Sequence, residues 1–95
     1  MEADKTKIKK LISKIARKHG VKKAGLFGSI VRSEMTAESD IDLLIEFESD
    51  KSLLDLVRLK MELEKSIGRK VDVLTYDSLH HLLRKKILAE QEIIF

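Results

Sequence analysis

The chain of 95 residues carries 19 Lys and Arg against 16 Asp and Glu, a net charge of +3, and 43% of its residues are hydrophobic. This length predicts a single domain over residues 1–95 with one modest core. The absence of cysteine excludes disulfides and thiolate metal sites, and the sequence lacks an apolar run typical of a signal peptide or membrane span, so we expect a cytoplasmic protein without a membrane partner.

The charges are distributed unevenly along the chain. Residues 1–23 contain nine Lys and Arg and two acidic residues, whereas residues 34–64 contain ten acidic residues and three Lys and Arg. The simpler interpretation is a pair of solvated helix faces, and the alternative is a surface that steers charged partners. Nucleic-acid binding is disfavoured, because aromatic residues make up 4% of the chain and no groove-reading motif occurs.

The first predicted elements are a helix and a strand. Apolar residues recur at helical spacing between Asp4 and His19, and Gly20 is the natural stop of that helix. Val21–Phe27 is the first expected strand, with lysines at its start and apolar residues at its end.

Gly28 and Ser29 follow this strand and are expected to open a short helix from Ile30 to about Glu34. Glycine permits a positive φ or the close approach of a ligand, and a helix start offers free N–H groups to a phosphate. The serine hydroxyl adds a further donor. The alternative interpretation is an ordinary turn followed by an N-cap.

Two polar residues near this turn are further candidates. Arg32 can clamp a phosphate chain, pair with a carboxylate to hold the loop, or remain a solvated surface residue. Ser39 directly precedes Asp40 and can preset the entrance of the next strand through a hydrogen bond to the turn.

Asp40–Phe47 is the second expected strand, with its two aspartates at the entrance. Side chains alternate along a strand, so Asp40 and Asp42 are expected on one side, with their Cα atoms roughly 7 Å apart. Carboxylates at that spacing can converge on one or two divalent ions.

The next predicted helix begins at Ser52, has Asp55 in the acidic position of a capping box, and ends at Ile67 before Gly68. Its apolar residues are spread too widely for a single narrow stripe. We interpret the excess as a homo- or hetero-oligomer surface, with a wholly intramolecular core as the alternative.

The third expected strand, Lys70–Thr75, places Asp72 between Val71 and Val73 and facing the opposite way. An unpaired acid is costly to bury, so a metal or a proton-transfer role would explain Asp72. The alternative is an exposed face of an edge strand.

The C-terminal part predicts a helix from Asp77 or Ser78 to Glu90, with one apolar stripe along it. His80 and His81 lack metal-binding spacing and are expected at the surface. Tyr76 is assigned to packing or to contact with a base, and residues 93–95 to a short strand or a packed tail. The apolar stripe of this helix comprises Leu79, Leu82, Leu83 and Ile87.

The segment GSIVRSEMTAESDIDLLIEF combines Gly28-Ser29, a spacer of ten residues, and Asp40-Ile41-Asp42. This GS-x10-D-x-D pattern resembles the nucleotidyltransferase superfamily that includes DNA polymerase β, and the small size resembles the minimal nucleotidyltransferases (MNT) of HEPN–MNT toxin–antitoxin pairs. Many relatives have Ala and Gly where this chain has Val31 and Ser33.

The resemblance implies an α/β (α+β) nucleotidyltransferase fold, in which a small mixed sheet of three to four strands packs against helices in the order α-β-α-β-α-β-α. It implies two Mg²⁺ ions and ATP as substrate. The implied catalytic and metal-ligating residues are Asp40, Asp42 and Asp72, and the implied nucleotide-binding residues are Gly28, Ser29, Arg32 and Ser39.

The resemblance also implies a function: an antitoxin that transfers AMP from ATP to a tyrosine hydroxyl of a HEPN toxin. The residues alone leave two alternatives open. One is a nucleotidyltransferase that acts on a small molecule with a separate substrate-binding subunit. The other is a non-catalytic module that occludes a partner, against which the three aspartates count.

Overall fold

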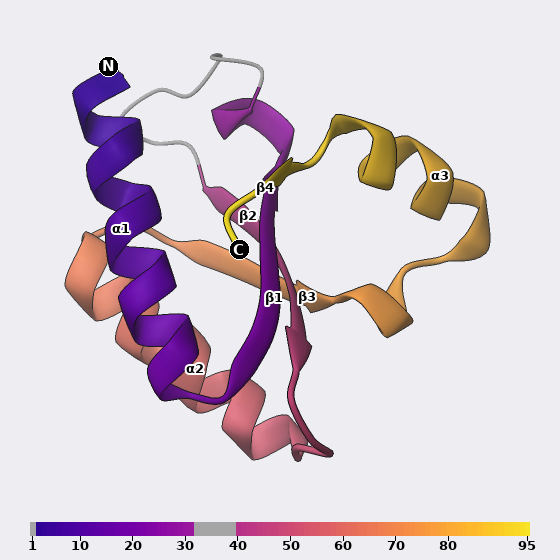
Figure 1. The fold of residues 1–95 in the computed structure, drawn as a ribbon, viewed down its shortest axis with the longest axis horizontal. Coiled ribbons are helices and arrows are strands. Elements are labelled where there is room, and N and C mark those ends of the chain that lie inside the picture. The colour runs from indigo at the N-terminus through magenta and orange to yellow at the C-terminus, as the bar shows by residue number, and fades with distance from the viewer. Residues whose placement is uncertain (1, 32–39) are drawn as a thin grey trace.

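The computed structural model describes residues 2–31 and 40–95, without the side chains of residues 2–4 and 29. Its strands form one mixed sheet in the order β3-β2-β1-β4, in which β1 is antiparallel to both β2 and β4, and β2 is parallel to β3. This confirms the predicted fold class. The elements (Figure 1) are α1 (Glu2–Lys18), β1 (Val21–Phe27), the 3-10 turn η1 (Gly28–Ile30), β2 (Ile41–Phe47), α2 (Leu53–Ile67), β3 (Val71–Thr75), the 3-10 turn η2 (Tyr76–Ser78), α3 (His81–Glu90) and β4 (Glu92–Ile93).

The core lies between one face of the sheet and the two helices α1 and α2, which lie on the same side of the sheet (Figure 1). Alternation along β2 sends Ile41, Leu43 and Ile45 to this face, and each is fully buried. The apolar stripes of the helices meet them, as the sequence predicts. The helical part of this core is Ile8, Ile12, Ile15 and Ala16 of α1 and Leu59 and Leu63 of α2.

Both ends of α2 form as predicted. The Ser52 hydroxyl accepts a hydrogen bond from the N–H of Asp55, and the Asp55 side chain accepts one from the N–H of Ser52. The hydrogen bonds that the Asp55 carboxylate accepts from the N–H and from the hydroxyl of Ser52 lower the pKa of Asp55. Gly68 ends the helix in the left-handed conformation, with φ +77°.

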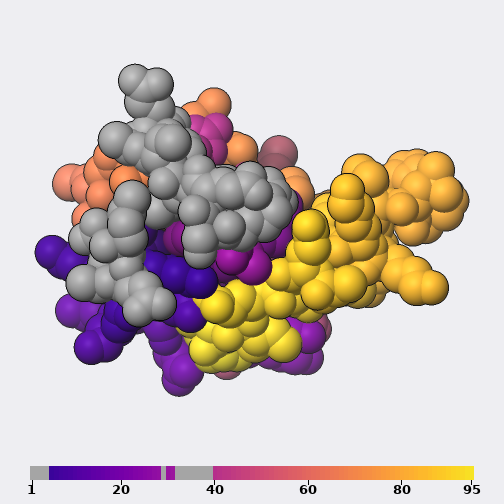
Figure 2. All heavy atoms as spheres, turned by 90° about the horizontal axis from the view of Figure 1, so that it is seen from above, coloured from indigo at the N-terminus to yellow at the C-terminus, as the bar shows by residue number. Residues whose placement is uncertain are grey.

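The prediction for α3 is wrong in two respects. The helix starts at His81, because residues 76–78 form η2 and the His80 ring accepts a hydrogen bond from the N–H of Leu82 as the N-cap. The predicted apolar stripe is not buried: Leu82 is 75% exposed, and α3 contains no buried residue. Seen from above, this part of the chain projects from the body of the protein (Figure 2).

β4 forms one edge of the sheet and pairs with β1. The carboxylate of Glu92 lies 3.2 Å from Lys5 Nζ and 2.6 Å from Lys9 Nζ, so two lysines of α1 hold the last strand. The contact with Lys9, followed by that with Lys5, lowers the pKa of Glu92. Across residues 2–31 and 40–95, no helix has the combination of length and apolar character that a membrane crossing requires.

Candidate active site

Three strand ends meet at one edge of the sheet. Because β1 is antiparallel to β2 and β2 is parallel to β3, the carboxyl end of β1 lies beside the amino ends of β2 and β3. The turn η1 follows β1 at this edge. The predicted glycine-serine turn and the predicted acidic residues are therefore brought to the same place by the topology.

Asp42 and Asp72 are direct neighbours across β2 and β3, because the parallel register pairs them. Directly paired residues of adjacent strands point to the same face, and the strands lie about 4.8 Å apart. Ile41 and Val71, one position earlier, are fully buried on the opposite face under the helices. The two carboxylates therefore share the face of the sheet that points away from α1 and α2, and both residues are partly exposed there.

Asp40 lies just outside the sheet. The prediction that β2 starts at Asp40 is wrong by one residue: the strand starts at Ile41, whose N–H donates to the carbonyl of Lys70 over 2.9 Å. Strand alternation therefore does not determine the direction of the Asp40 side chain. In the described part of the chain, no group of three or more His, Cys, Asp and Glu is arranged to hold a metal ion.

The donor set formed by Asp42 and Asp72 nevertheless fits Mg²⁺. This ion takes hard oxygen ligands and is commonly held by one or two carboxylates together with oxygens of a phosphate substrate, without a complete cage of protein ligands. Two carboxylates on neighbouring strands match that requirement.

Gly28, the first residue of η1, lies against the carboxylate of Asp42. Its φ is +78°, and a Cβ built at this position would overlap Oδ2 of Asp42. The absence of a side chain therefore allows the turn to lie directly against the carboxylate. Sequence reasoning assigned Gly28 to a positive φ or a close approach to a ligand, and the structure shows the positive φ together with close approach to a protein group.

Gly28–Ile30 forms η1, which closes with a 3.1 Å hydrogen bond from Val31 N–H to the Gly28 carbonyl. Residues 32–34 of the helix expected from Ile30 to about Glu34 lie outside the described residues, so that helix stays a prediction. The positive φ of Gly28 lets the chain turn immediately after β1. Arg32, Ser39 and the hydroxyl of Ser29 lie outside the described part of the structure, and their roles stay predictions.

Glu64 is a positioning residue that the sequence analysis missed. Its Oε2 atom accepts a 2.9 Å hydrogen bond from the N–H of Val71, the first residue of β3. Lys70 O is bonded to β2, so in a parallel ladder the N–H of Val71 points away from β2 and needs another acceptor. Glu64 thus anchors the strand that carries Asp72. No sequence signal identifies this contact, because it depends on how α2 returns to the sheet.

Tyr76 packs on the same sheet face as the aspartates. It is 7% exposed, and its hydroxyl donates to Gln91 Oε1 over 2.6 Å. A Cβ on Gly25 would lie 3.0 Å from the Tyr76 hydroxyl, so the ring end rests on β1. Burial, followed by the charge of Glu46, raises the pKa of Tyr76. Of the two roles left open for Tyr76, the structure shows packing.

A sequence profile of the family described as polymerase beta, nucleotidyltransferase matches residues 9–95. A relative from Methanocaldococcus jannaschii, provisionally named as a protein adenylyltransferase, is 59% identical over 83 residues, which are 87% of this chain and 89% of the relative. The protein adenylyltransferase MntA of Thermococcus cleftensis is 38% identical over 76 residues, or 80% of this chain and 77% of the relative.

Solved structures support the same assignment. A structure described provisionally as a minimal nucleotidyltransferase is 36% identical, with a TM-score of 0.79 over 88% of this chain and 86% of that one. A toxin–antitoxin structure with AMP-PNP shares the fold, with a TM-score of 0.82 and 19% identity over 92% of this chain and 72% of that one. The chain therefore belongs to the polymerase β-type nucleotidyltransferase family, among its minimal members of the protein adenylyltransferase type.

Proposed function

We propose that this protein is an antitoxin that transfers AMP from ATP to a tyrosine hydroxyl of a HEPN toxin, with Mg²⁺ as the metal. The relatives named protein adenylyltransferase support the reaction class. One structure of this fold contains AMP-PNP, and another is a tri-AMPylated Shewanella oneidensis HEPN toxin in complex with an MNT antitoxin, with a TM-score of 0.76 and 17% identity. They support ATP as donor and a HEPN protein as partner.

The observation that carries the proposal is the pairing of Asp42 with Asp72 beside Gly28. Nucleotidyl transfer requires positioning and neutralisation of charge more than covalent chemistry by the protein. Asp40, Asp42 and Asp72 are the proposed ligands of two Mg²⁺ ions. When bound, Mg²⁺ supplies positive charge against the phosphate oxygens.

The residues of the chain then have separate tasks. The backbone at Gly28 and Ser29 receives the β- and γ-phosphates, with Arg32 and Ser39 as further contacts to the nucleotide. The tyrosine oxygen of the acceptor forms a bond to the α-phosphorus, the bond from that phosphorus to the bridging oxygen breaks, and pyrophosphate leaves. Asp72 accepts the proton of the tyrosine hydroxyl as general base.

The test is to incubate the protein with ATP, Mg²⁺ and a HEPN partner, and to weigh the partner by mass spectrometry. We expect a mass gain of one or more AMP units. Asp42→Asn and Asp72→Asn are each expected to slow the transfer by about 100-fold or more, since each removes charge from the site. Asp50→Asn is the matched control, because Asp50 is an exposed aspartate in the turn after β2, at the other end of that strand.

Two results would contradict the proposal. An unmodified partner that binds tightly would indicate an occluding module without catalysis. Transfer of AMP to a small hydroxyl compound, with the partner unmodified, would indicate a nucleotidyltransferase of small molecules.

A further inference from the structure

The outward face of α2 is apolar. Leu53, Leu54, Val57 and Met61 are 75%, 56%, 41% and 64% exposed. Their spacing of three and four residues places them on one stripe, opposite to Leu59 and Leu63, which are fully buried. The core therefore accounts for one face of α2 and leaves a second apolar face in contact with water.

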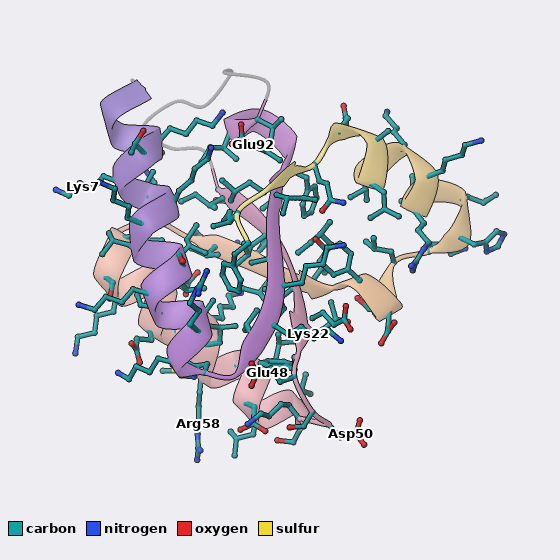
Figure 3. The ribbon with its side chains drawn as sticks, in the orientation of Figure 1. Lys7, Lys22, Glu48, Asp50, Arg58 and Glu92 are labelled. Carbon is teal, nitrogen blue, oxygen red and sulfur yellow. The ribbon has the colours of Figure 1, made fainter. Side chains whose placement is uncertain are left out.

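The exposed charges on α1 and α2 are of one sign, whereas the turn before α2 carries the exposed acidic residues Glu48 and Asp50. Every charged side chain that is exposed on α2, and on the described part of α1, is a cation. Figure 3 shows Lys7 of α1 and Arg58 of α2 pointing away from the body of the protein. These exposed cations are Lys7, Lys10, Lys14, Arg17 and Lys18 of α1 and Arg58 and Lys65 of α2.

The acidic residues of α2 have partners within the protein, and of the exposed cations these partners include Lys18. Glu62 lies 3.3 Å from Lys18 Nζ and 3.1 Å from His19 Nε2. Asp55 forms the capping box, and Glu64 accepts the hydrogen bond at the start of β3. The outer surface of the two-helix layer thus combines an apolar stripe with a positive border.

We propose that the stripe of Leu53, Leu54, Val57 and Met61, with its border of Arg58, Lys65 and the α1 lysines, is the docking surface for an acidic amphipathic helix of a partner protein. An apolar row at helical spacing pairs with the apolar face of another helix. Glutamates or aspartates beside that face would then meet the cations. The charge complementarity sets the orientation of the partner and speeds its association.

The charge pattern argues against two other occupants. A second copy docked through the middle of the same stripe on a two-fold axis would bring Arg58 close to its own counterpart, which is repulsive. A nucleic-acid backbone would satisfy the lysines but would leave four exposed aliphatic side chains without an apolar partner.

This surface lies across the sheet from the candidate active site. The helices cover the face that carries Ile41 and Val71, whereas Asp42 and Asp72 point to the other face. A partner on α2 therefore leaves the aspartates accessible. The inference does not depend on the transfer reaction, and it can fail while the proposed reaction holds.

The probe is a designed helical peptide with a leucine face flanked by glutamates, compared with the same peptide carrying lysines in their place. Binding to the full chain is measured by fluorescence anisotropy at concentrations where the peptides are monomeric. We expect the glutamate peptide to bind and the lysine peptide not to bind, with affinity falling as salt is raised. Met61→Asp is expected to weaken binding about tenfold, a typical loss for one interface residue.

Two variants make the test specific. The double variant Arg58→Glu, Lys65→Glu is expected to bind the glutamate peptide more weakly and to bind the lysine peptide. Leu82→Asp, an equivalent substitution at a 75% exposed leucine of α3, is expected to leave binding unchanged, with circular dichroism confirming that each variant is folded.

The proposal is overturned by any of four results. The glutamate peptide does not bind, both peptides bind alike, or Leu82→Asp weakens binding as much as Met61→Asp. The fourth is that the free chain self-associates in light scattering or binds a labelled RNA duplex, and that Met61→Asp abolishes this association.

Discussion

Gly28 lies directly against the carboxylate of Asp42, so closely that a Cβ on residue 28 would overlap Oδ2 of that side chain. The Gly28→Ala substitution therefore has two effects: strain at a positive φ and displacement of Asp42. We expect a loss of stability of about 1 kcal/mol from the backbone strain. We also expect a loss of AMP transfer of about 100-fold, because a carboxylate at the site moves.

Gly68 provides the matched control for this prediction. Its φ of +77° equals that of Gly28 within one degree, but a Cβ there would meet nothing within 4 Å. Gly68→Ala should therefore show a similar loss of stability in urea unfolding and retain transfer activity. Equal losses of activity in the two variants would show that strain alone, and not contact with Asp42, explains the effect.

The hydrogen bond from Val71 N–H to Glu64 predicts an effect on catalysis from a side chain that does not face the site. Glu64→Ala leaves the N–H of Val71 without its acceptor and loosens the start of β3, which carries Asp72. We expect kcat to fall about tenfold with little change in the KM for ATP, together with a loss of about 1 kcal/mol in unfolding free energy. Glu64→Gln keeps an acceptor oxygen and should recover most of both losses, which a role for the negative charge alone would not allow.

The ion pairs of Glu92 with Lys5 and Lys9 predict a pH-dependent contribution to stability. The lysines hold the pKa of Glu92 below its ordinary value of 4.5. A carboxyl group whose pKa is lower in the folded state stabilises the protein above its unfolded pKa, and this contribution is lost as the pH falls through the folded pKa. Glu92→Gln should therefore be less stable than the parent by about 0.5–1 kcal/mol at pH 7, with the difference vanishing below the folded pKa.

Urea unfolding from pH 7 to pH 3 measures this difference. Glu48→Gln is the control, because Glu48 is exposed, and its stability should follow that of the parent at every pH. A constant difference between Glu92→Gln and the parent across the whole range would rule out the ion pairs as its cause.

The hydrogen bond from the Tyr76 hydroxyl to Gln91, the residue after α3, predicts that substitutions at Gly25 and Tyr76 have coupled effects on stability. A Cβ on Gly25 would lie 2.6 Å from Gln91 Oε1 and 3.0 Å from the Tyr76 hydroxyl, the two atoms of one hydrogen bond. Gly25→Ala and Tyr76→Phe should each cost about 1 kcal/mol, and the double variant should cost less than the sum because the same bond is lost. Amide exchange in residues 81–91 should become faster in each variant. Additive losses would contradict a shared bond.

The sequence predicted best where local rules decide the structure. The bounds of α2 follow from the capping box of Ser52 and Asp55 and from the left-handed stop at Gly68, all of which act within a few residues. Val21–Phe27 forms the predicted strand over its full length. These elements depend little on the rest of the chain.

The predictions were weaker where long-range packing decides. The periodicity of residues 79–87 predicts a buried stripe, but α3 has no sheet or helix to cover it among the described residues, and a polar link to Tyr76 holds it instead. The same limit applies to the site. Sequence spacing predicts that Asp40 and Asp42 converge, and this stays a prediction because β2 starts at Ile41. The pairing of Asp42 with Asp72 depends on strand order and register. The hydrogen bond between Glu64 and Val71 depends on the path of the backbone from α2 to β3, which the sequence pattern does not indicate.

The last strand also has a consequence for biosynthesis. β4 pairs with the outer edge of β1, and Glu92 links it to α1, so α1 and β1 leave the ribosome before the strand that contacts both of them. Until residues 92–95 emerge, the nascent chain exposes an unpaired β1 edge, which invites pairing with other chains. Premature truncation before Glu92 should therefore produce aggregates rather than a shortened native protein.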